Sequence, residues 1–168
     1  MFPLATLNVY LFLNPSSGEC NIDDLRSILK PFDLCLLAKQ EVFNNERLDE
    51  LTKSSSFLYS IYDADRQHSF DNAIASRYPF ESCKNQSASF FSDGGTRSIL
   101  KCHLHDDHPC IENHLFTVTH SDHLNDSNRL KQSKAFTREK DFIDILLFDI
   151  NALTRDDYSD DYYKKNIV

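Results

Sequence analysis

The stretch LLFDINALTRDDYS, residues 146–159, joins an apolar run with one aspartate to an asparagine and then to an acidic, polar segment. Such a run is typical of a buried strand that ends in a loop. A strand of this kind could carry Asp149 and Asn151 into a functional site, or it could simply end in a turn. Partners for these two side chains would have to come from the ends of other strands.

Several other strand-like segments also end in polar residues. Asn8 lies in the apolar segment 5–13, Gln40 and Glu41 end the apolar segment 32–43, and His120 lies in the run THSDH that follows a strand pattern. Each residue taken singly is typical of an ordinary turn, cap or solvated strand end. Their recurrence at strand ends favours one shared site.

The remaining pattern predicts a domain built on sheets. Strands are expected at 5–13, 32–43, 54–64, 72–82 (broken by Pro79), 97–104, 114–119 and 144–149, and helices at 23–30, 44–54 and 126–143. The mixture of strands, helices and paired strands predicts an α+β or α/β domain. With 168 residues, 40% of them hydrophobic, the chain is expected to form a single domain over residues 1–168.

Composition also limits the partners and the location of the protein. The net charge of −8 disfavours a protein that holds nucleic acid by charge alone, because phosphate binding needs clustered Lys and Arg. The five cysteines form no CxxC pair, and the N-terminal segment has neither a basic region nor a cleavage pattern. No apolar run is long enough to span a membrane. We expect an intracellular protein.

Five segments in order resemble the motifs of the endonuclease/exonuclease/phosphatase family. They are LNV, KQEVF, NAIASRYPF, THSDHLNDSNRLKQ and LLFDINALTRDDYS, between residues 5 and 158. The family motifs read approximately T-x-N-x, L-Q-E-V, N-A-I-L-S-R-Y-P, T-H-L-D-H and G-D-F-N-A. Each motif alone occurs by chance, whereas five in the family's order form a specific pattern.

The resemblance implies a DNase I-like four-layer α/β sandwich, in which two packed sheets lie between helices. It also implies a Mg²⁺- or Mn²⁺-dependent phosphodiesterase or phosphatase. Glu41 and Asn8 would hold the metal or its waters, and His120, Asp149 and Asn151 would be catalytic. The substrate would be a phosphate ester, namely nucleic acid, a phospholipid head group or a small phosphoester.

The chemistry of phosphoester cleavage is consistent with these residue types. Mg²⁺ prefers oxygen ligands, and Glu41 supplies a carboxylate. Charge that develops on phosphate oxygens needs aimed donors, and His120 and Asn151 are suitable donors. Asp149 would orient the attacking water or handle the proton of the leaving oxygen.

The family's final Ser-Asp-His motif, whose histidine is the general base, has no match between Asn151 and Val168. The resemblance therefore predicts a C-terminally truncated or divergent copy that lacks the last strands and is nearly inactive. The alternative is a non-catalytic relative that binds a phosphorylated ligand or a protein partner.

Two further segments carry possible metal ligands. CHLHDDHPC, residues 102–110, contains the histidine and cysteine types that zinc prefers, but a hairpin between two strands is the favoured interpretation. TRDDYSDDYY, residues 154–163, lacks the calcium-loop spacing and is expected to be a solvated loop.

Overall fold

The computed structural model describes residues 2–14, 16–42, 45–62, 71–86, 99–105, 114–121, 129 and 143–149. Within these residues the elements are β1 (Leu4–Asn8), a 3-10 turn (Tyr10–Phe12), α1 (Ile22–Leu29), β2 (Leu36–Val42), α2 (Asn45–Ser54), β3 (Tyr59–Tyr62), β4 (Asp71–Ser76), β5 (Phe80–Gln86), β6 (Ile99–Leu104), β7 (Leu115–His120) and β8 (Ile145–Asp149).

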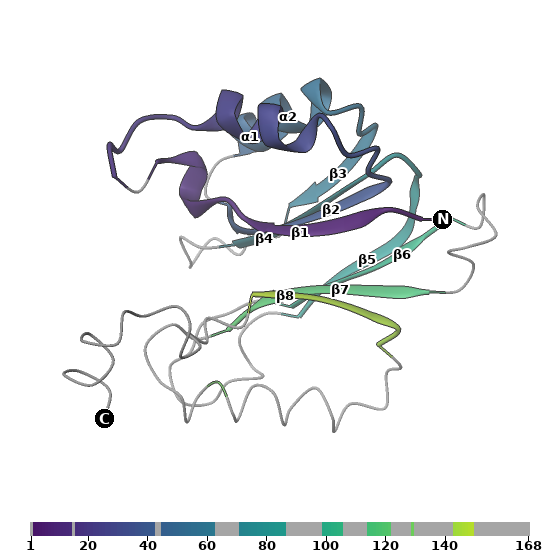
Figure 1. The fold of residues 1–168 in the computed structure, drawn as a ribbon. Coiled ribbons are helices and arrows are strands. Elements are labelled where there is room, and N and C mark those ends of the chain that lie inside the picture. The colour runs from purple at the N-terminus through teal and green to yellow at the C-terminus, as the bar shows by residue number, and fades with distance from the viewer. Residues whose placement is uncertain are drawn as a thin grey trace, which may run out of the picture.

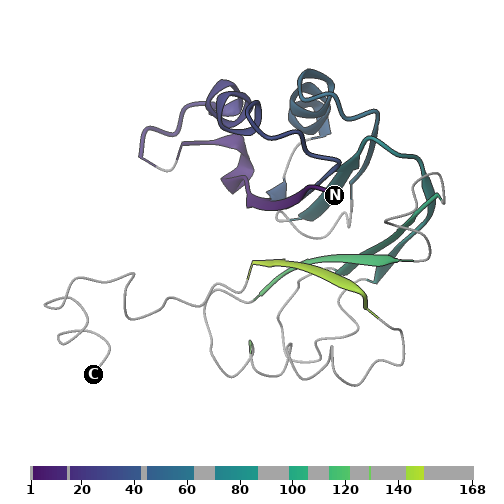
Figure 2. The ribbon, with the colours of Figure 1, turned by 45° about the vertical axis from the view of Figure 1, so that its right-hand side comes forward.

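The strands form two mixed sheets of four strands each. The first sheet has the order β1-β2-β4-β3, and the second has the order β5-β6-β7-β8. In the first sheet β1 runs parallel to β2, and in the second β7 runs parallel to β8. The two sheets pack face to face, with α1 and α2 covering the outer face of the first sheet (Figures 1 and 2).

Two apolar clusters hold these layers together. One lies between the helices and the first sheet and includes Leu25, Leu37 and Leu48. The other lies between the two sheets and includes Leu36, Phe116 and Leu147. Alternate residues of β2 therefore enter opposite clusters, which explains why its sequence is apolar without alternation.

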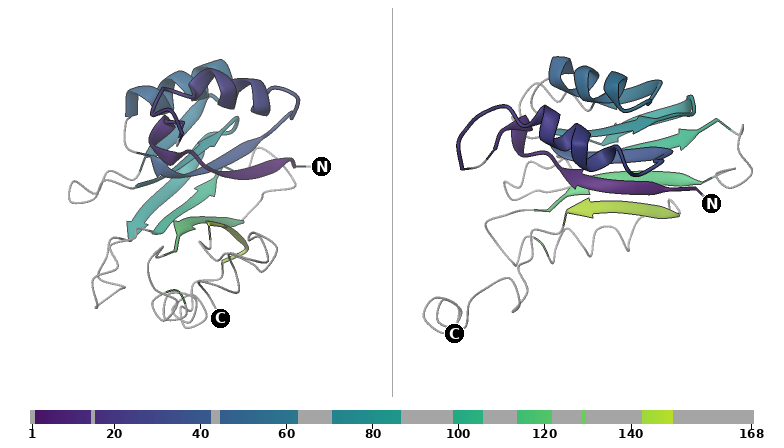
Figure 3. Two further views of the ribbon diagram at one scale, coloured as in Figure 1. Left: turned by 60° about the vertical axis from the view of Figure 1, so that its left-hand side comes forward. Right: turned by 45° about the horizontal axis from the view of Figure 1, so that its top comes forward.

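The edge strands β1 and β8 contact one another across the interface between the sheets. Figure 3 shows β1 and β8 side by side in its right-hand view. Carboxyl ends of the parallel pairs β1–β2 and β7–β8 consequently meet at one edge of the sandwich. This arrangement brings together polar strand ends that are far apart in the sequence.

The elements agree with the sequence patterns, with one correction at the first strand. The prediction of a strand over 5–13 is wrong beyond Asn8, because Tyr10, Leu11 and Phe12 have φ values of 44°, 60° and 59°. Side chains with a Cβ rarely adopt this left-handed region. Phe12 is nevertheless fully buried, and its burial in the helix-side cluster accompanies the turn.

Of the helix predicted at 126–143, the structure describes two residues: Arg129, which is helical, and Ile143, which precedes β8. The other residues of this prediction lie outside the described part of the chain. Among the helices that the structure describes, none is long and apolar enough to cross a membrane.

Candidate functional site

Glu41 reaches the site through a β-bulge at the end of β2. The register runs from Lys39 opposite Ala73 to Val42 opposite Asp71, so β2 has one residue more than β4 in this interval. Glu41 has a φ of 57°, a conformation that is strained for a residue other than glycine. The bulge returns Val42 to the helix-side cluster.

Asn8 ends β1 and orients the neighbouring carboxylate. Its Nδ2 donates a hydrogen bond of 2.8 Å to Oδ2 of Asp149. Its Oδ1 accepts a hydrogen bond of 2.9 Å from the backbone N–H of Tyr10. Because both ends of the amide are used, the side chain of Asn8 is fixed between the two sheets.

The strand ends beside Asn8 are tied together by further hydrogen bonds. Nε2 of Gln40 donates to Oγ1 of Thr6 at 2.8 Å, and the N–H of Val9 donates to the carbonyl of Gln40 at 3.0 Å. These bonds join the ends of β1 and β2. Gln40 is therefore a structural residue at this edge.

His120 and Asp149 come from the ends of the parallel pair β7–β8. They lie opposite each other in the register, and the N–H of Ser121 donates to the carbonyl of Asp149 at 2.8 Å. His120 follows Phe116 and Val118 on alternate positions, and both of these lie in the cluster between the sheets. The same alternation places Phe148 on the opposite face of β8 from Asp149.

The imidazole of His120 lies between two carboxylates from different sheets. Its Nε2 is 3.6 Å from Oε1 of Glu41 and 3.5 Å from Oδ2 of Asp149. The side chain of His120 is 2% exposed, whereas that of Asp149 is 26% exposed. The cluster is therefore buried on the His120 side and open to solvent on the Asp149 side.

One carboxylate oxygen of this cluster lacks a hydrogen-bond partner among the described residues. Oε2 of Glu41 is buried, and no hydrogen-bond donor reaches it within the described part of the chain. A buried carboxylate oxygen is costly unless a donor or a cation compensates it. The two carboxylates at this edge supply oxygen atoms of the type that Mg²⁺ accepts, with water completing the coordination.

Among the described residues, no three His, Cys, Asp or Glu side chains are arranged so that together they could hold a metal ion. Of the predicted site residues, Asn8, Glu41, His120 and Asp149 lie together. Asn151 lies outside the described residues, as do His108 of the CHLHDDHPC segment and His123 of the THSDH run. From the CHLHDDHPC segment, Cys102 contacts Cys83 on the neighbouring strand.

Lys39, two residues before Glu41, faces the opposite side of β2. Its side chain is fully buried, and its Nζ has no hydrogen-bond partner among the described residues. Burial lowers the pKa of Lys39 from 10.5 to about 7, and the charge of Asp49 on α2 opposes this shift. The sequence places this lysine inside a strand that is predicted to be buried on both faces, which is unusual for a charged side chain.

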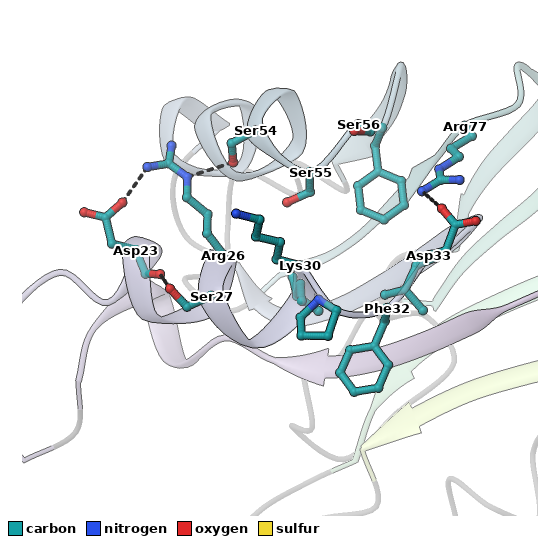
Figure 4. Close-up of a pocket in the computed structure, with 14 residues that line it drawn as sticks. Asp23, Arg26, Ser27, Lys30, Phe32, Asp33, Ser54, Ser55, Ser56 and Arg77 are labelled. Atoms are coloured by element: carbon teal, nitrogen blue, oxygen red, sulfur yellow. Dashed lines mark hydrogen bonds and ion pairs between the residues drawn. The ribbon is translucent and has the colours of Figure 1, made fainter.

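A pocket of about 650 Å³ lies at the other end of β2, between the ends of α1 and α2 (Figure 4). Lys30, Phe32 and Ser55 line it, and ion pairs of Arg26 with Asp23 and of Arg77 with Asp33 flank it. The residues that line this pocket include 29–34, which precede β2, whereas Glu41 lies near the carboxyl end of that strand. At the rise per residue of a strand, the pocket is roughly 20 Å from Glu41. This pocket is separate from the carboxylate–histidine cluster.

Comparison with solved structures identifies the fold. The chain is similar to a mannosyl-6-phosphatase from Bacteroides thetaiotaomicron (TM-score 0.66, 16% identity, covering 92% of this chain and 67% of that one). It is also similar to an endonuclease/exonuclease/phosphatase family protein from the same organism (TM-score 0.67, 16% identity, 89% and 62% covered). A third similar structure is TDP2 from D. rerio with a single-strand DNA product (TM-score 0.66, 17% identity, 91% and 62% covered).

No family model and no curated protein matches the sequence. The chain spans between 62% and 67% of the length of these three structures. The two facing mixed sheets, together with TM-scores of 0.66 and 0.67 to these solved structures, confirm the fold predicted from the motifs. The chain therefore has the DNase I-like fold of the endonuclease/exonuclease/phosphatase proteins.

Proposed function

We propose that this protein is a metal-dependent phosphoester hydrolase whose site contains Asn8, Glu41, His120 and Asp149. The observation that carries the proposal is the position of His120 Nε2 between the carboxylates of Glu41 and Asp149, which come from two different sheets. An interior packing role would not require two carboxylates around one buried imidazole. A phosphoryl-transfer site does require charged groups and donors around one point.

Glu41 would hold the cation, together with water, because its Oε2 is buried and no donor among the described residues reaches it. A bound divalent cation supplies stabilisation of the negative charge that develops on phosphate oxygens. Asp149 would orient the attacking water or receive a proton, and Asn8 keeps its carboxylate in place through the 2.8 Å hydrogen bond. Asn8 thus acts chiefly as a positioning residue.

His120 would donate a hydrogen bond from Nε2 to a phosphate oxygen that lies at the open side of the cluster. Its burial fixes the ring, so little reorganisation is needed when charge develops on the phosphate. Asn151, two residues after Asp149 in the sequence, would add a second donor.

The substrate class is a phosphate ester. The similar structures include a mannosyl-6-phosphatase and a protein bound to a single-strand DNA product, so sugar phosphates and nucleic acid strands are both suitable first substrates. The net charge of −8 disfavours tight binding of duplex DNA by charge alone.

We expect the protein to hydrolyse bis-p-nitrophenyl phosphate or p-nitrophenyl phosphate with Mg²⁺ or Mn²⁺, and EDTA to abolish the reaction. Release of nitrophenolate measures both rates. Lys30→Ala, in the separate pocket, should leave the rate unchanged and serves as the matched control. Hydrolysis that persists in EDTA, or that Lys30→Ala removes, would contradict the assignment of the site.

The substitution His120→Gln is expected to lower kcat by roughly 10²- to 10³-fold, because it removes a donor aimed at the transition state. The thermal midpoint should change by only a few degrees, since glutamine keeps most of the buried volume. Thr117→Val, on the same strand and equally buried, is the control and should retain activity. If His120→Gln lost stability and activity in parallel, His120 would be a packing residue instead.

A further inference from the structure

Two cysteines face each other across the antiparallel strands β5 and β6. Cys83 and Cys102 are direct partners in the register, and their Sγ atoms are 2.7 Å apart. Neither cysteine takes part in a disulfide. Residues directly opposite in an antiparallel pair have Cα separations of about 4.5 to 5.5 Å, which lie within the range that a disulfide spans. The backbone can therefore accept a bond between these sulfurs without a large movement.

The two thiols have different environments. Cys83 is exposed on β5, which is an edge strand of the second sheet. Cys102 is 1% exposed and belongs to the cluster between the sheets. A reagent from solvent can therefore reach Cys83 first, whereas Cys102 is accessible mainly to its neighbour.

The contact also favours reactivity at the exposed position. The hydrogen bond with the Cys102 thiol lowers the pKa of Cys83, and partial burial opposes this effect. Because the thiolate is the nucleophile in thiol–disulfide exchange, a lower pKa raises the reactive fraction at neutral pH. An exposed thiol of this kind with a buried thiol beside it is the arrangement of an attacking and a resolving cysteine.

We propose that Cys83 and Cys102 form a dithiol site that exchanges with small-molecule disulfides of the glutathione type. The Cys83 thiolate attacks one sulfur of the oxidised reagent, forms a mixed disulfide and releases one thiol. Cys102 then gives up its proton and attacks Sγ of Cys83, which breaks the mixed disulfide and releases the second thiol. Overall, two protein thiols are oxidised to one disulfide, and one small disulfide is reduced to two thiols.

The bond would tie the edge strand β5 to β6 and close a loop between residues 83 and 102. Closing a loop of about 20 residues restricts the unfolded chain. The oxidised protein should therefore unfold at a thermal midpoint roughly 5 to 10 °C above that of the reduced protein.

The test uses oxidised glutathione and mass spectrometry of the intact and digested full chain. The wild type should lose two hydrogen atoms and yield a peptide pair joined through Cys83 and Cys102. Cys102→Ser should stop at a glutathione adduct on Cys83, because the resolving thiol is missing. Cys83→Ser should leave Cys102 unmodified, and Cys20→Ser, which removes an exposed cysteine elsewhere, should behave as the wild type.

A stable glutathione adduct at Cys83 of the wild type would overturn the proposal, as would reaction at Cys20 faster than at Cys83. The wild-type measurement does not depend on the folding of any variant. An oxidised wild type with a thermal midpoint equal to that of the reduced form would contradict the predicted bond between β5 and β6.

Discussion

Glu41→Gln is expected to reduce metal-dependent phosphoester hydrolysis by roughly 10²- to 10⁴-fold. The substitution keeps the shape of the side chain and removes the charge that would hold a divalent cation. The buried Oε2 of Glu41, which lacks a donor among the described residues, is the atom whose loss should matter most. Initial rates at saturating Mg²⁺ or Mn²⁺ give the size of the effect.

The fold should survive this change, because glutamine can occupy the same bulge between Lys39 and Val42. Glu50→Gln is a matched control, since Glu50 is a solvent-accessible carboxylate on α2 that pairs with Arg26. The control should retain the full rate. Activity of Glu41→Gln equal to that of Glu50→Gln would remove Glu41 from the site.

Lys39→Met is expected to stabilise the protein by roughly 2 to 5 kcal/mol at pH 7, because an apolar side chain of similar length replaces a buried amine that has no hydrogen-bond partner among the described residues. Lys39 is fully buried, and its Nζ has no hydrogen-bond partner in the described part of the chain. For a chain of this size the gain corresponds to a rise in Tm of roughly 5 to 15 °C. Calorimetric or circular-dichroism melting measures it.

The stability difference should also depend on pH. Burial lowers the pKa of folded Lys39 to about 7, whereas an unfolded lysine keeps a pKa near 10.5. Between these values the unfolded chain binds one more proton, so wild-type stability falls by about 1.4 kcal/mol for each unit of decreasing pH. Below the folded pKa of Lys39 the wild-type stability no longer falls. The Lys39→Met variant has no titrating group at this position, so its stability should not show this pH dependence.

Lys53→Met, at an exposed position of α2, is the control and should leave both the Tm and its pH dependence almost unchanged. A Lys39→Met variant that melts at or below the wild-type temperature throughout pH 7 to 10 would show that the amine has a stabilising partner.

Most elements could be predicted from local patterns in the sequence. Apolar runs indicate which segments are buried, and capping residues mark where helices begin. The unbroken apolar run of β2 predicted a strand buried on both faces, and Pro79 marked the break between β4 and β5. The ordered motifs predicted the sandwich, since each polar strand end belongs to a different strand. The fold could therefore be predicted before any contact was known.

The details of the site depend on tertiary contacts and could not be predicted in the same way. The bulge at Glu41 has no glycine to mark it, and it becomes visible only in the pairing of β2 with β4. The bond from Asn8 to Asp149 joins residues 141 positions apart, so no local pattern contains it. The left-handed turn at Tyr10–Phe12 likewise follows an apolar segment that is typical of a continuing strand.

The most direct measurement is a calorimetric titration of the wild type and of Glu41→Gln with Mn²⁺ and Mg²⁺, with Glu50→Gln as the control. The central claim is that the carboxylate of Glu41 holds a divalent cation at the edge where the two sheets meet. The account predicts saturable binding to the wild type and to the control, and binding weakened by at least about tenfold in Glu41→Gln. Equal binding by all three proteins, or no binding by any of them, would contradict it.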